Sequence, residues 1–310
     1  DPLWSRGLGD VYKRQLFFCA AQGDNKQKGL QHFAHEGLVR RTIGGHYGMA
    51  RKIGAMVVQN KIAAFDFPQG VLAHLLRDIA GRQPGELTKV GIGTFVDPRH
   101  GGGKMNRLTE QEEDMVQLVN LNGEDYLFYK TFPINFAILA GTYADEDGNI
   151  SFEREGVKSE ALDLAMACKS CGGTVVAQVQ RVVRSGSLDP RKVEVPGVLV
   201  DAVVVASDQK YCMQNFGSQY NPGFSGEHLM GLSEFQPEPL ESKKIIARRA
   251  ALELEKGSVV NLGVGIPEYI SSVALEEGIT HKFTLTVEDG LFGGNPQSGL
   301  DFGVSLNPAC

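Results

Sequence analysis

The sequence predicts an α/β fold in which helices alternate with strands of mainly parallel sheets. Two segments carry this prediction, residues 62–95 and 258–287, because each has the strand, helix, strand order of a βαβ unit. The length adds to it, since 310 residues correspond to about two domains at roughly 150 residues each.

In the first segment, residues 62–67 and residues 89–95 are predicted strands on either side of a helix. One helical face between them collects five apolar side chains, which are Val71, Leu72, Leu75, Leu76 and Ile79. A parallel pair of strands joined by this helix is therefore expected.

The next segment predicts antiparallel structure. Asn122-Gly123 lies between the apolar runs 116–121 and 126–129, which is a strong hairpin signal. Residues 134–139 follow as a buried strand. Residues 145–149 are interpreted as a turn, because the spacing and closing Glu of a calcium-binding loop are missing.

A helix is predicted from a capping Ser159, with Glu160 in its first turn, to Cys168. Residues 174–183 and 198–205 are the best strand candidates in this half. A Pro- and Gly-rich stretch follows, and residues 226–240 are taken as a linker between domains.

A second unit begins after the linker. Residues 243–255 predict a helix that ends before Gly257, and residues 258–262 predict a strand. The turn 263–267 leads into a helix carrying four apolar residues, Ile270, Val273, Ala274 and Leu275. Residues 283–287 form the next strand, which ends directly at Glu288.

Composition excludes several classes of function. The 31 basic and 37 acidic residues give a net charge of -6 without a basic block, so nucleic acid and anionic membrane surfaces are not expected partners. No apolar run approaches the ~18 residues of a membrane-spanning helix. The five scattered cysteines fit a reducing compartment, and we expect a cytoplasmic protein.

Both ends of the sequence are unusual. Residues 1–15 lack apolar periodicity and are interpreted as a non-native leader outside the fold. The other end follows closely on a dense Gly-rich motif, which usually lies inside a domain. We therefore expect the second domain to be incomplete.

The turn Gly263-Val264-Gly265-Ile266-Pro267 is the first candidate site. Its glycines allow close backbone approach, and Pro267 suits a first helical turn. Free N–H groups at a helix start could bind an anion or a developing oxyanion. The alternative is a tight strand-to-helix turn without further function.

Glu288 is the second candidate. It ends a strand and is followed by three glycines, Gly290, Gly293 and Gly294. Ligands of open parallel sheets bind beyond the carboxyl ends of the strands. The alternative is a solvated acid at a strand end.

Gly263 and Gly265 also resemble part of a dinucleotide-binding motif, with Glu288 as the ribose-binding acid. Glu268 occupies the third glycine position and breaks that motif. A nicotinamide-dependent oxidoreductase is therefore the weaker hypothesis.

Three other groups are weaker candidates. Cys168 and Cys171 are spaced as in thioredoxins but end a helix, so a structural role is favoured and no metal site is predicted. His46 lies in a flexible loop and could line a site. The run Gly101, Gly102, Gly103 could approach a phosphate-bearing ligand.

Several motifs together resemble the glutamate-dependent (class I) CoA-transferases, especially the bacterial single-chain acetate/propionate/acetoacetate type. The resemblance covers about residues 30–310. It rests on Ile43-Gly-Gly-His-Tyr-Gly48, Asn60-Lys-Ile62, Phe67-Pro-Gln-Gly-Val71, His74-Leu-Leu-Arg-Asp78, Gly93-Thr-Phe-Val-Asp-Pro-Arg99, Gly141-Thr-Tyr-Ala-Asp-Glu-Asp-Gly-Asn149, Asn261-Leu-Gly-Val-Gly-Ile-Pro267 and Thr286-Val-Glu-Asp-Gly290.

The resemblance implies two related open α/β domains, 16–225 and 241–310, the first lacking its N-terminal segment and the second incomplete. It implies that Glu288 is the catalytic nucleophile and that Val264 and Gly265 supply backbone N–H groups to an oxyanion hole. Gly263, Gly290, Gly293, Gly294, Gly101–Gly103 and His46 are expected to contact CoA or substrate.

The implied activity is CoA transfer from a short-chain acyl-CoA to a carboxylic acid through a covalent glutamyl-CoA thioester, with ping-pong kinetics. Acetate, propionate, butyrate and acetoacetate are the expected acids, which points to short-chain fatty acid or ketone body metabolism. CoA would be a substrate, no cofactor is expected, and the whole protein is expected to form a homo-oligomer.

Other functions remain open at this point. An acyl-CoA hydrolase could use the same carboxylate with water as acceptor. A non-enzymatic ligand-binding module is, like the oxidoreductase, less favoured than the hydrolase, because it would not need Glu288. The chain as given is expected to carry the nucleophile but to be inactive.

Overall fold

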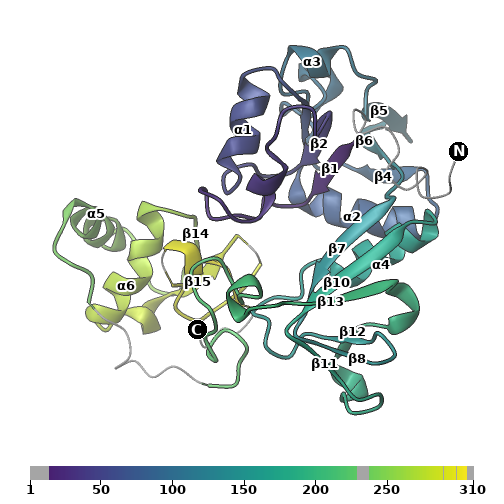
Figure 1. The fold of residues 1–310 in the computed structure, drawn as a ribbon. Helices are drawn as coiled ribbons and strands as arrows, with labels where there is room; N and C mark the ends of the chain where they lie inside the picture. Colours follow the sequence, from purple (N-terminus) through teal and green to yellow (C-terminus); the bar gives the residue numbers. More distant parts are fainter. Residues whose placement is uncertain (1–13, 229–236, 289, 298, 306–310) are drawn as a thin grey trace, which may run out of the picture. The chain divides into compact units, whose positions relative to one another are not determined.

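The computed structural model describes residues 14–228, 237–288, 290–297 and 299–305. The chain divides into two compact units. The first contains the described residues through Leu139, with Glu160–Val176 and Leu199–Ala202; the second contains Ala140–Ser159, Ala177–Val198 and the described residues from Val203 onward (Figure 1). The division at residues 226–240 stays a prediction, and residues 229–236 of that linker lie outside the described residues, as do 1–13 of the leader.

The first unit contains a parallel three-stranded sheet in the order β1-β2-β3. Its strands are β1 (Gln15–Phe18), β2 (Arg41–Gly44) and β3 (Ala63–Asp66). Gln15, the last residue of the predicted leader, is the first residue of β1 and pairs with Arg41. Gln15 is therefore part of this sheet rather than of a leader outside the fold.

Helices α1 (Arg51–Val58), α2 (Gln69–Ala80) and α3 (Arg107–Glu110) lie in the same unit. The predicted apolar face of α2 is confirmed, since each of its five side chains is 5% exposed or less. Their helical spacing gathers them on one side, where burial of each large side chain contributes about 2 kcal/mol.

The predicted strand at residues 89–95 is wrong. These residues form turns, and the strand after α2 is β4 (Gly85–Thr88), which pairs antiparallel with β6. Gly91 and Gly93 have φ values of 97° and 75°, outside the β region of a regular strand. The parallel unit predicted over residues 62–95 is therefore not formed, and the parallel partner of β3 is β2.

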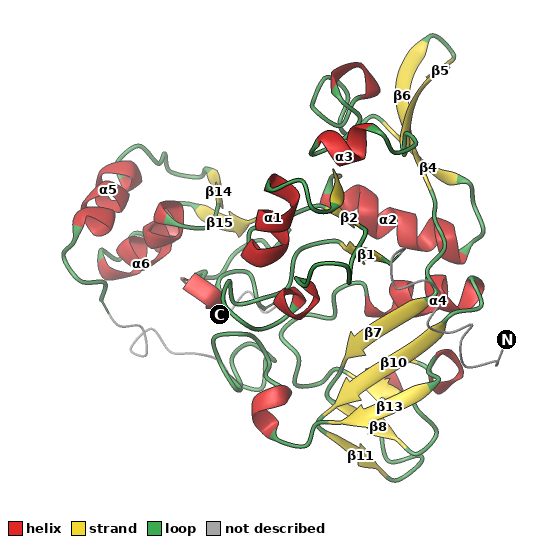
Figure 2. Cartoon of the chain, turned by 45° about the horizontal axis from the view of Figure 1, so that its top comes forward, coloured by secondary structure: helices red, strands yellow, loops and turns green. Residues whose placement is uncertain are grey.

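The predicted hairpin is confirmed. Strands β5 (Val116–Leu121) and β6 (Glu124–Lys130) pair antiparallel, and the sheet has the order β4-β6-β5 (Figure 2). Asn122 and Gly123 have φ values of 53° and 85°, the left-handed conformation that a two-residue hairpin turn requires.

Helix α4 (Ala161–Ser170) is confirmed, but its predicted cap is wrong. Ser159 has a φ of 47° rather than the extended conformation of a capping serine, and Glu160 precedes the first helical residue without capping it through its side chain. The helix lies against α2, where the Ser170 hydroxyl donates a hydrogen bond to the Ile79 carbonyl at 2.9 Å.

Two further sheets follow. One has the order β13-β10-β7, with β7 (Phe136–Ala140), β10 (Thr174–Val179) and β13 (Ala202–Val205). The other has the order β11-β8-β9-β12, with β8 (Tyr143–Asp145), β9 (Ile150–Ser151), β11 (Arg181–Val183) and β12 (Val193–Val195).

The predicted strand 174–183 is therefore two strands in different sheets. The break is at Gln180, whose N–H donates to the Thr142 carbonyl at 3.0 Å. The predicted strand 198–205 begins only at Ala202, because Gly197–Leu199 form a 3-10 turn. The turn at 145–149 is confirmed: one Asp145 oxygen accepts the N–H groups of Asp147 and Asn149.

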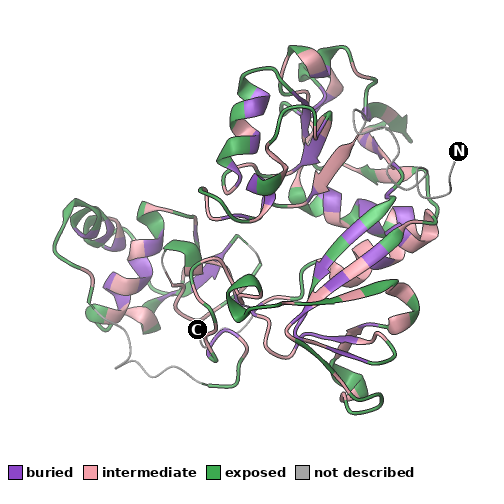
Figure 3. Cartoon of the chain, in the orientation of Figure 1, coloured by how far each residue is buried: buried purple, intermediate pink, exposed green. Residues whose placement is uncertain are grey.

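The second βαβ unit is confirmed. Strands β14 (Val259–Leu262) and β15 (Thr284–Val287) are parallel, and α6 (Tyr269–Glu276) connects them. Helix α5 (Ser242–Ala251) precedes this unit and ends earlier than predicted. Leu262, Val273, Ala274 and Leu285 form its core with Ala247 of α5. Figure 3 shows buried residues on α6 and β15.

A buried lysine holds α5 to the following helix. Lys244 is 8% exposed, donates to the Glu238 carbonyl at 2.7 Å and forms an ion pair with Glu276. Among the described helices, none is long and apolar enough to cross a membrane.

Candidate active site

The turn after β14 adopts a conformation that only glycine accommodates. Gly265 has φ and ψ of 102° and -130°, and a 3-10 turn, Ile266–Glu268, follows before α6 begins. Pro267 lies in that first turn, as predicted. The Val264 side chain is 65% exposed.

Glu288 lies at the tip of a tight reversal that follows β15. The Gly290 N–H donates to the Val287 carbonyl at 3.0 Å, and the Val287 N–H donates to the Leu291 carbonyl at 3.2 Å. The chain then runs back along β15, with the Gly293 N–H bound to the Leu285 carbonyl at 2.8 Å. These bonds fix the backbone on both sides of an exposed carboxylate.

The glycine turn and Glu288 face each other. A methyl group added at Gly263 would lie 3.6 Å from Glu288 Oε2, with no other atom within 4 Å outside its chain neighbours. The proximity follows from topology, because β14 and β15 are parallel neighbours and their carboxyl ends meet at one sheet edge. In the part of the chain that is described, no residue donates a hydrogen bond to the Glu288 carboxylate or pairs with it.

The three glycines after Glu288 also adopt left-handed conformations. Gly290, Gly293 and Gly294 have φ values of 89°, 89° and 73°. Gly290 and Gly293 build the reversal itself, so these predicted site glycines lie in the same turn as the carboxylate.

Glu268, which entered the sequence analysis only as the residue that breaks a dinucleotide-binding motif, lies next to the glycine turn. Its side chain is buried, at 5% exposure of the residue, and accepts two backbone hydrogen bonds at 3.1 Å, from Gly265 to Oε2 and from Gly299 to Oε1. Its position three residues after the glycine that starts a helical turn was the available signal.

The contact changes the predicted roles in the turn. The Gly265 N–H, predicted as an oxyanion donor, already donates to Glu268. The Val264 N–H has no acceptor among the described residues. The same contact disfavours dinucleotide binding. The Gly265 N–H, which would donate to a pyrophosphate, is already bonded to the negatively charged Glu268 carboxylate.

His46 and Gly103 lie in the first unit, around Asp66 at the end of β3. The Asp66 N–H donates to the Gly103 carbonyl at 2.9 Å, and a methyl group at Gly103 would come within 2.6 Å of the Phe67 ring. Burial raises the pKa of Asp66, and the nearby His46 lowers it in part. The structure thus brings together two predicted site residues that are far apart in sequence.

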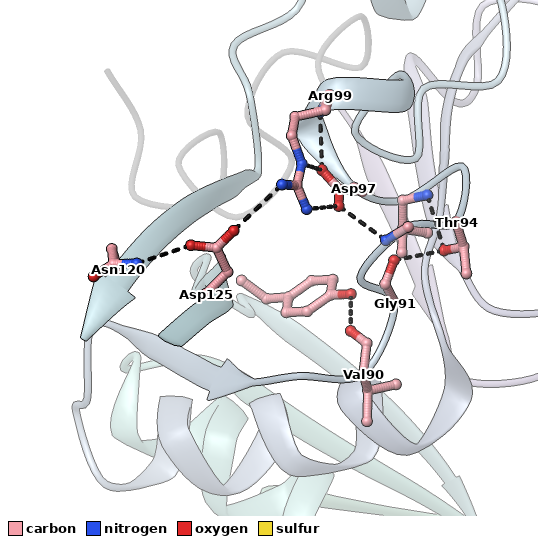
Figure 4. Close-up of polar contacts among 10 residues, drawn as sticks. Val90, Gly91, Thr94, Asp97, Arg99, Asn120 and Asp125 are labelled. Atoms are coloured by element: carbon pink, nitrogen blue, oxygen red, sulfur yellow. Dashed lines mark hydrogen bonds and ion pairs between the residues drawn. The ribbon is translucent and has the colours of Figure 1, made fainter. Parts of the chain in front are cut away.

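Gly101 and Gly102 follow a loop that the buried Asp97 holds together, and the Gly102 N–H donates to the Asp97 carbonyl at 3.1 Å. Figure 4 shows Asp97 between Arg99 and the backbone of this loop. Asp97 is 0% exposed and accepts hydrogen bonds from the Gly93 N–H at 2.9 Å and from Arg99 through its backbone N–H, Nε and a terminal guanidinium nitrogen. The Arg99 side chain holds the pKa of Asp97 well below its usual range.

The sequence analysis also missed this cluster. An Asp directly before Pro at the start of a short helical turn was the signal, because that position caps free N–H groups. The cluster extends outward, since Arg99 pairs with Asp125 at 3.3 Å and Asp125 accepts from Asn120.

The cysteine pair fits its structural interpretation. Cys168 lies near the end of α4, and burial raises the pKa of its thiol to about 11. A thiol with this pKa stays protonated at neutral pH and is a poor nucleophile. No group of three or more His, Cys, Asp or Glu placed to hold a metal occurs within the described ranges.

Fold and site together define an α/β protein in which an exposed strand-end carboxylate faces a glycine turn. The sequence model of the family described as Coenzyme A transferase matches residues 9–206. The chain therefore belongs to the coenzyme A transferase family.

Named relatives agree with this assignment. The chain is 47% identical over 288 residues to a caffeate CoA-transferase from Acetobacterium woodii, covering 93% of this chain and 55% of that protein. It is 42% identical over 307 residues to the acetate CoA-transferase YdiF of Escherichia coli, covering 97% and 57%. The chain thus spans somewhat more than half the length of these relatives.

One solved structure is similar over nearly the whole of this chain. The acyl-CoA transferase YdiF of Escherichia coli O157:H7, crystallised as a thioester complex with CoA, superposes with a TM-score of 0.82 at 39% identity, covering 96% of this chain and 59% of that chain. This likeness confirms the predicted α/β class of the fold.

Proposed function

We propose that this chain supplies the nucleophile of an acyl-CoA:carboxylate CoA-transferase, and that the nucleophile is Glu288. The exposed Glu288 carboxylate, 3.6 Å from the position of a methyl group at Gly263, carries the proposal. A nucleophile needs an unpaired, accessible oxygen beside groups that stabilise developing charge. The family assignment and the thioester complex of YdiF support it.

The first half-reaction would proceed in two steps. A Glu288 oxygen attacks the thioester carbonyl of the donor, a C–O bond forms, the C–S bond breaks, and CoA leaves as a thiolate. The thiolate then attacks the glutamyl carbonyl of the mixed anhydride. A C–S bond forms, the anhydride C–O bond breaks, and the donor acid leaves as a carboxylate.

The second half-reaction reverses these steps with the acceptor. Its carboxylate attacks the glutamyl-CoA thioester and releases the CoA thiolate, which then takes the acyl group from the anhydride. Each tetrahedral intermediate carries an oxyanion. Of the two amides predicted for the oxyanion hole, Val264 and Gly265, the Val264 N–H is the one without an acceptor among the described residues. One preorganised donor of this kind contributes roughly 3 kcal/mol.

The substrates follow from this chemistry only as a class. CoA is a substrate rather than a resident cofactor, and both acids must present a free carboxylate. The relatives are named for caffeate and acetate, an aromatic and a small aliphatic acid, so they support carboxylate acceptors without fixing their size. Short-chain acids, a cytoplasmic location and a homo-oligomer remain predictions.

The test follows CoA transfer in a defined protein. Because the chain spans 57% of YdiF, we would compare the chain alone with a hybrid in which the uncovered part of YdiF follows residue 310. Acetyl-CoA should add CoA covalently to the folded hybrid, and an acceptor acid should remove it with ping-pong kinetics. The chain alone should stay unlabelled.

Three results would count against the proposal. A folded hybrid that takes no label from a panel of acyl-CoAs, while YdiF does, would contradict it. Release of free acid at the same rate with and without acceptor would favour the hydrolase. Label that persists in Glu288→Gln would show that another residue is the nucleophile.

A further inference from the structure

The geometry points to Glu268 as the positioning residue of this site, tying the glycine turn to the segment that starts at Gly299. The inference rests on the proposed function of Glu288 and assigns a role to a residue outside the predicted machinery. Its basis is the pair of backbone hydrogen bonds that the two Glu268 oxygens accept at 3.1 Å.

Capping explains only half of this arrangement. A Glu three residues into a helical turn often accepts the N–H of the residue that starts the turn, as Oε2 does with Gly265. The second oxygen reaches Gly299, which is 31 residues further along the chain than Glu268. A helix cap requires no such contact.

The cost of the arrangement also indicates a role. Glu268 is 5% exposed, and no ion pair joins it to a described Lys, Arg or His. A buried carboxylate satisfied by neutral donors is expensive compared with a neutral side chain. The start of α6 offsets part of that cost, because negative charge is favourable at a helix N-terminus.

The segment that Glu268 holds is itself anchored at its other end. Gly299–Asp301 form a 3-10 turn, and Asp301 accepts hydrogen bonds from Asn215 at 2.9 Å and from Ser218 at 3.3 Å. A methyl group at Gly217 would lie 3.1 Å from Leu300 Cβ and 3.2 Å from Asp301 Oδ1, so the side chains of this turn pack against Gly217. Glu268 therefore connects the turn beside Glu288 to an anchored segment rather than to a free loop.

This connection has a consequence for the chemistry. With the Gly265 N–H bound to Glu268, the conformation of Gly265 is fixed and the adjacent Val264 N–H is left for the oxyanion. A misplacement of about 1 Å at such a site can lower the rate about 100-fold. Loss of Glu268 should therefore slow attack by Glu288 while leaving CoA binding in place.

The test separates positioning from folding. In Glu268→Ala and Glu268→Gln, the amide NMR signals of Gly265 and Gly299 should both shift in the 310-residue chain, since each loses or weakens the same acceptor. The matched control is Glu255→Ala, an exposed glutamate in the same unit. It should move neither signal.

Labelling of Glu288 by acetyl-CoA is then timed in the hybrid. We expect Glu268→Ala to slow it about 100-fold at unchanged affinity for CoA. Glu268→Gln, which keeps one acceptor oxygen, should recover part of the loss. If the loss of labelling rate in each variant is instead proportional to the fraction of that variant that is unfolded, Glu268 has only a structural role and the inference is overturned.

Two outcomes separate this inference from the proposed function. If the parent hybrid takes no label at Glu288, the proposed function fails. The amide signals alone then show whether Glu268 connects Gly265 to Gly299. If Gly265 shifts and Gly299 does not, Glu268 is only a helix cap and the inference fails.

Discussion

Asp97 and Glu288 both lie beside glycine-rich turns, yet one carboxylate is enclosed and the other is exposed. Asp97 is 0% exposed, and both of its carboxylate oxygens accept hydrogen bonds, from the Gly93 N–H and from the Arg99 side chain. Glu288 has no partner among the described residues and faces the open side of Gly263. A carboxylate whose oxygens are all bonded builds a loop, whereas one left unpaired at a strand end is available for chemistry.

The largest expected effect removes the unpaired carboxylate. Glu288→Gln keeps the shape of the side chain but lacks the nucleophilic oxygen, so CoA transfer by the hybrid should fall at least ~10⁴-fold. Its melting temperature should match the parent, because Glu288 makes no stabilising contact in the described structure. Steady-state rates and thermal unfolding check both statements. A large drop in melting temperature would show that Glu288, like Asp97, is structural.

Lys244 provides a test of a buried charged group in the second unit. Lys244→Ala removes the ion pair with the exposed Glu276 and the hydrogen bond to the Glu238 carbonyl, and should lower the free energy of unfolding by about 2 kcal/mol. Lys256→Ala, at an exposed site of the same unit, should cost less than about 0.5 kcal/mol. Urea unfolding of the two variants measures the difference, and equal values would show that the Lys244 contacts do not stabilise the unit.

Asp97 should show its role through pH. Hydrogen bonding by Arg99 lowers the native pKa of Asp97 below the value of about 3.9 of an unfolded Asp. The stabilisation is thus complete above about pH 5 and is lost as the pH falls through 4 toward the native pKa.

Asp97→Asn should therefore unfold more easily than the parent by about 2 kcal/mol at pH 7. The gap should narrow as the solution is acidified below pH 4, since Asn does not titrate. Urea unfolding across this pH range checks the trend. A difference in the free energy of unfolding that does not change with pH would show that the charge of Asp97 does not contribute to the stability.

The smallest effects distinguish two glycines of one turn. Gly263→Ala places a methyl group 3.6 Å from Glu288 Oε2 without backbone strain, so labelling should slow while the melting temperature holds. Gly265→Ala forces a side chain into a φ of 102° and should cost about 1–2 kcal/mol of stability. A loss of stability at Gly263 as large as at Gly265 would argue against this geometry.

The sequence predicted the elements whose pattern is local. The apolar face of α2, the Asn122-Gly123 hairpin and the parallel pair β14 and β15 are all present, because spacing and turn chemistry decide them. The strand expected at 89–95 failed for the same local reason, since Gly91 and Gly93 adopt left-handed backbone conformations.

Contacts between distant residues could not be predicted. The spacing of Glu268 three residues after Gly265 indicates a bond to the Gly265 N–H, but nothing in it indicates that Glu268 also reaches Gly299. Likewise, the break at Gln180 depends on Thr142 in another strand. The position of Glu288 beside Gly263 was predictable, because parallel strands bring their carboxyl ends to one edge.

The most direct test maps the site of the covalent adduct. The hybrid is incubated with acetyl-CoA, treated with borohydride to reduce the glutamyl thioester to an alcohol, and digested for peptide mass spectrometry. We predict that the reduced residue is Glu288 and that CoA transfer is lost in proportion. Reduction at another carboxylate, with Glu288 unmodified in inactivated protein, would contradict the assignment of Glu288 as nucleophile.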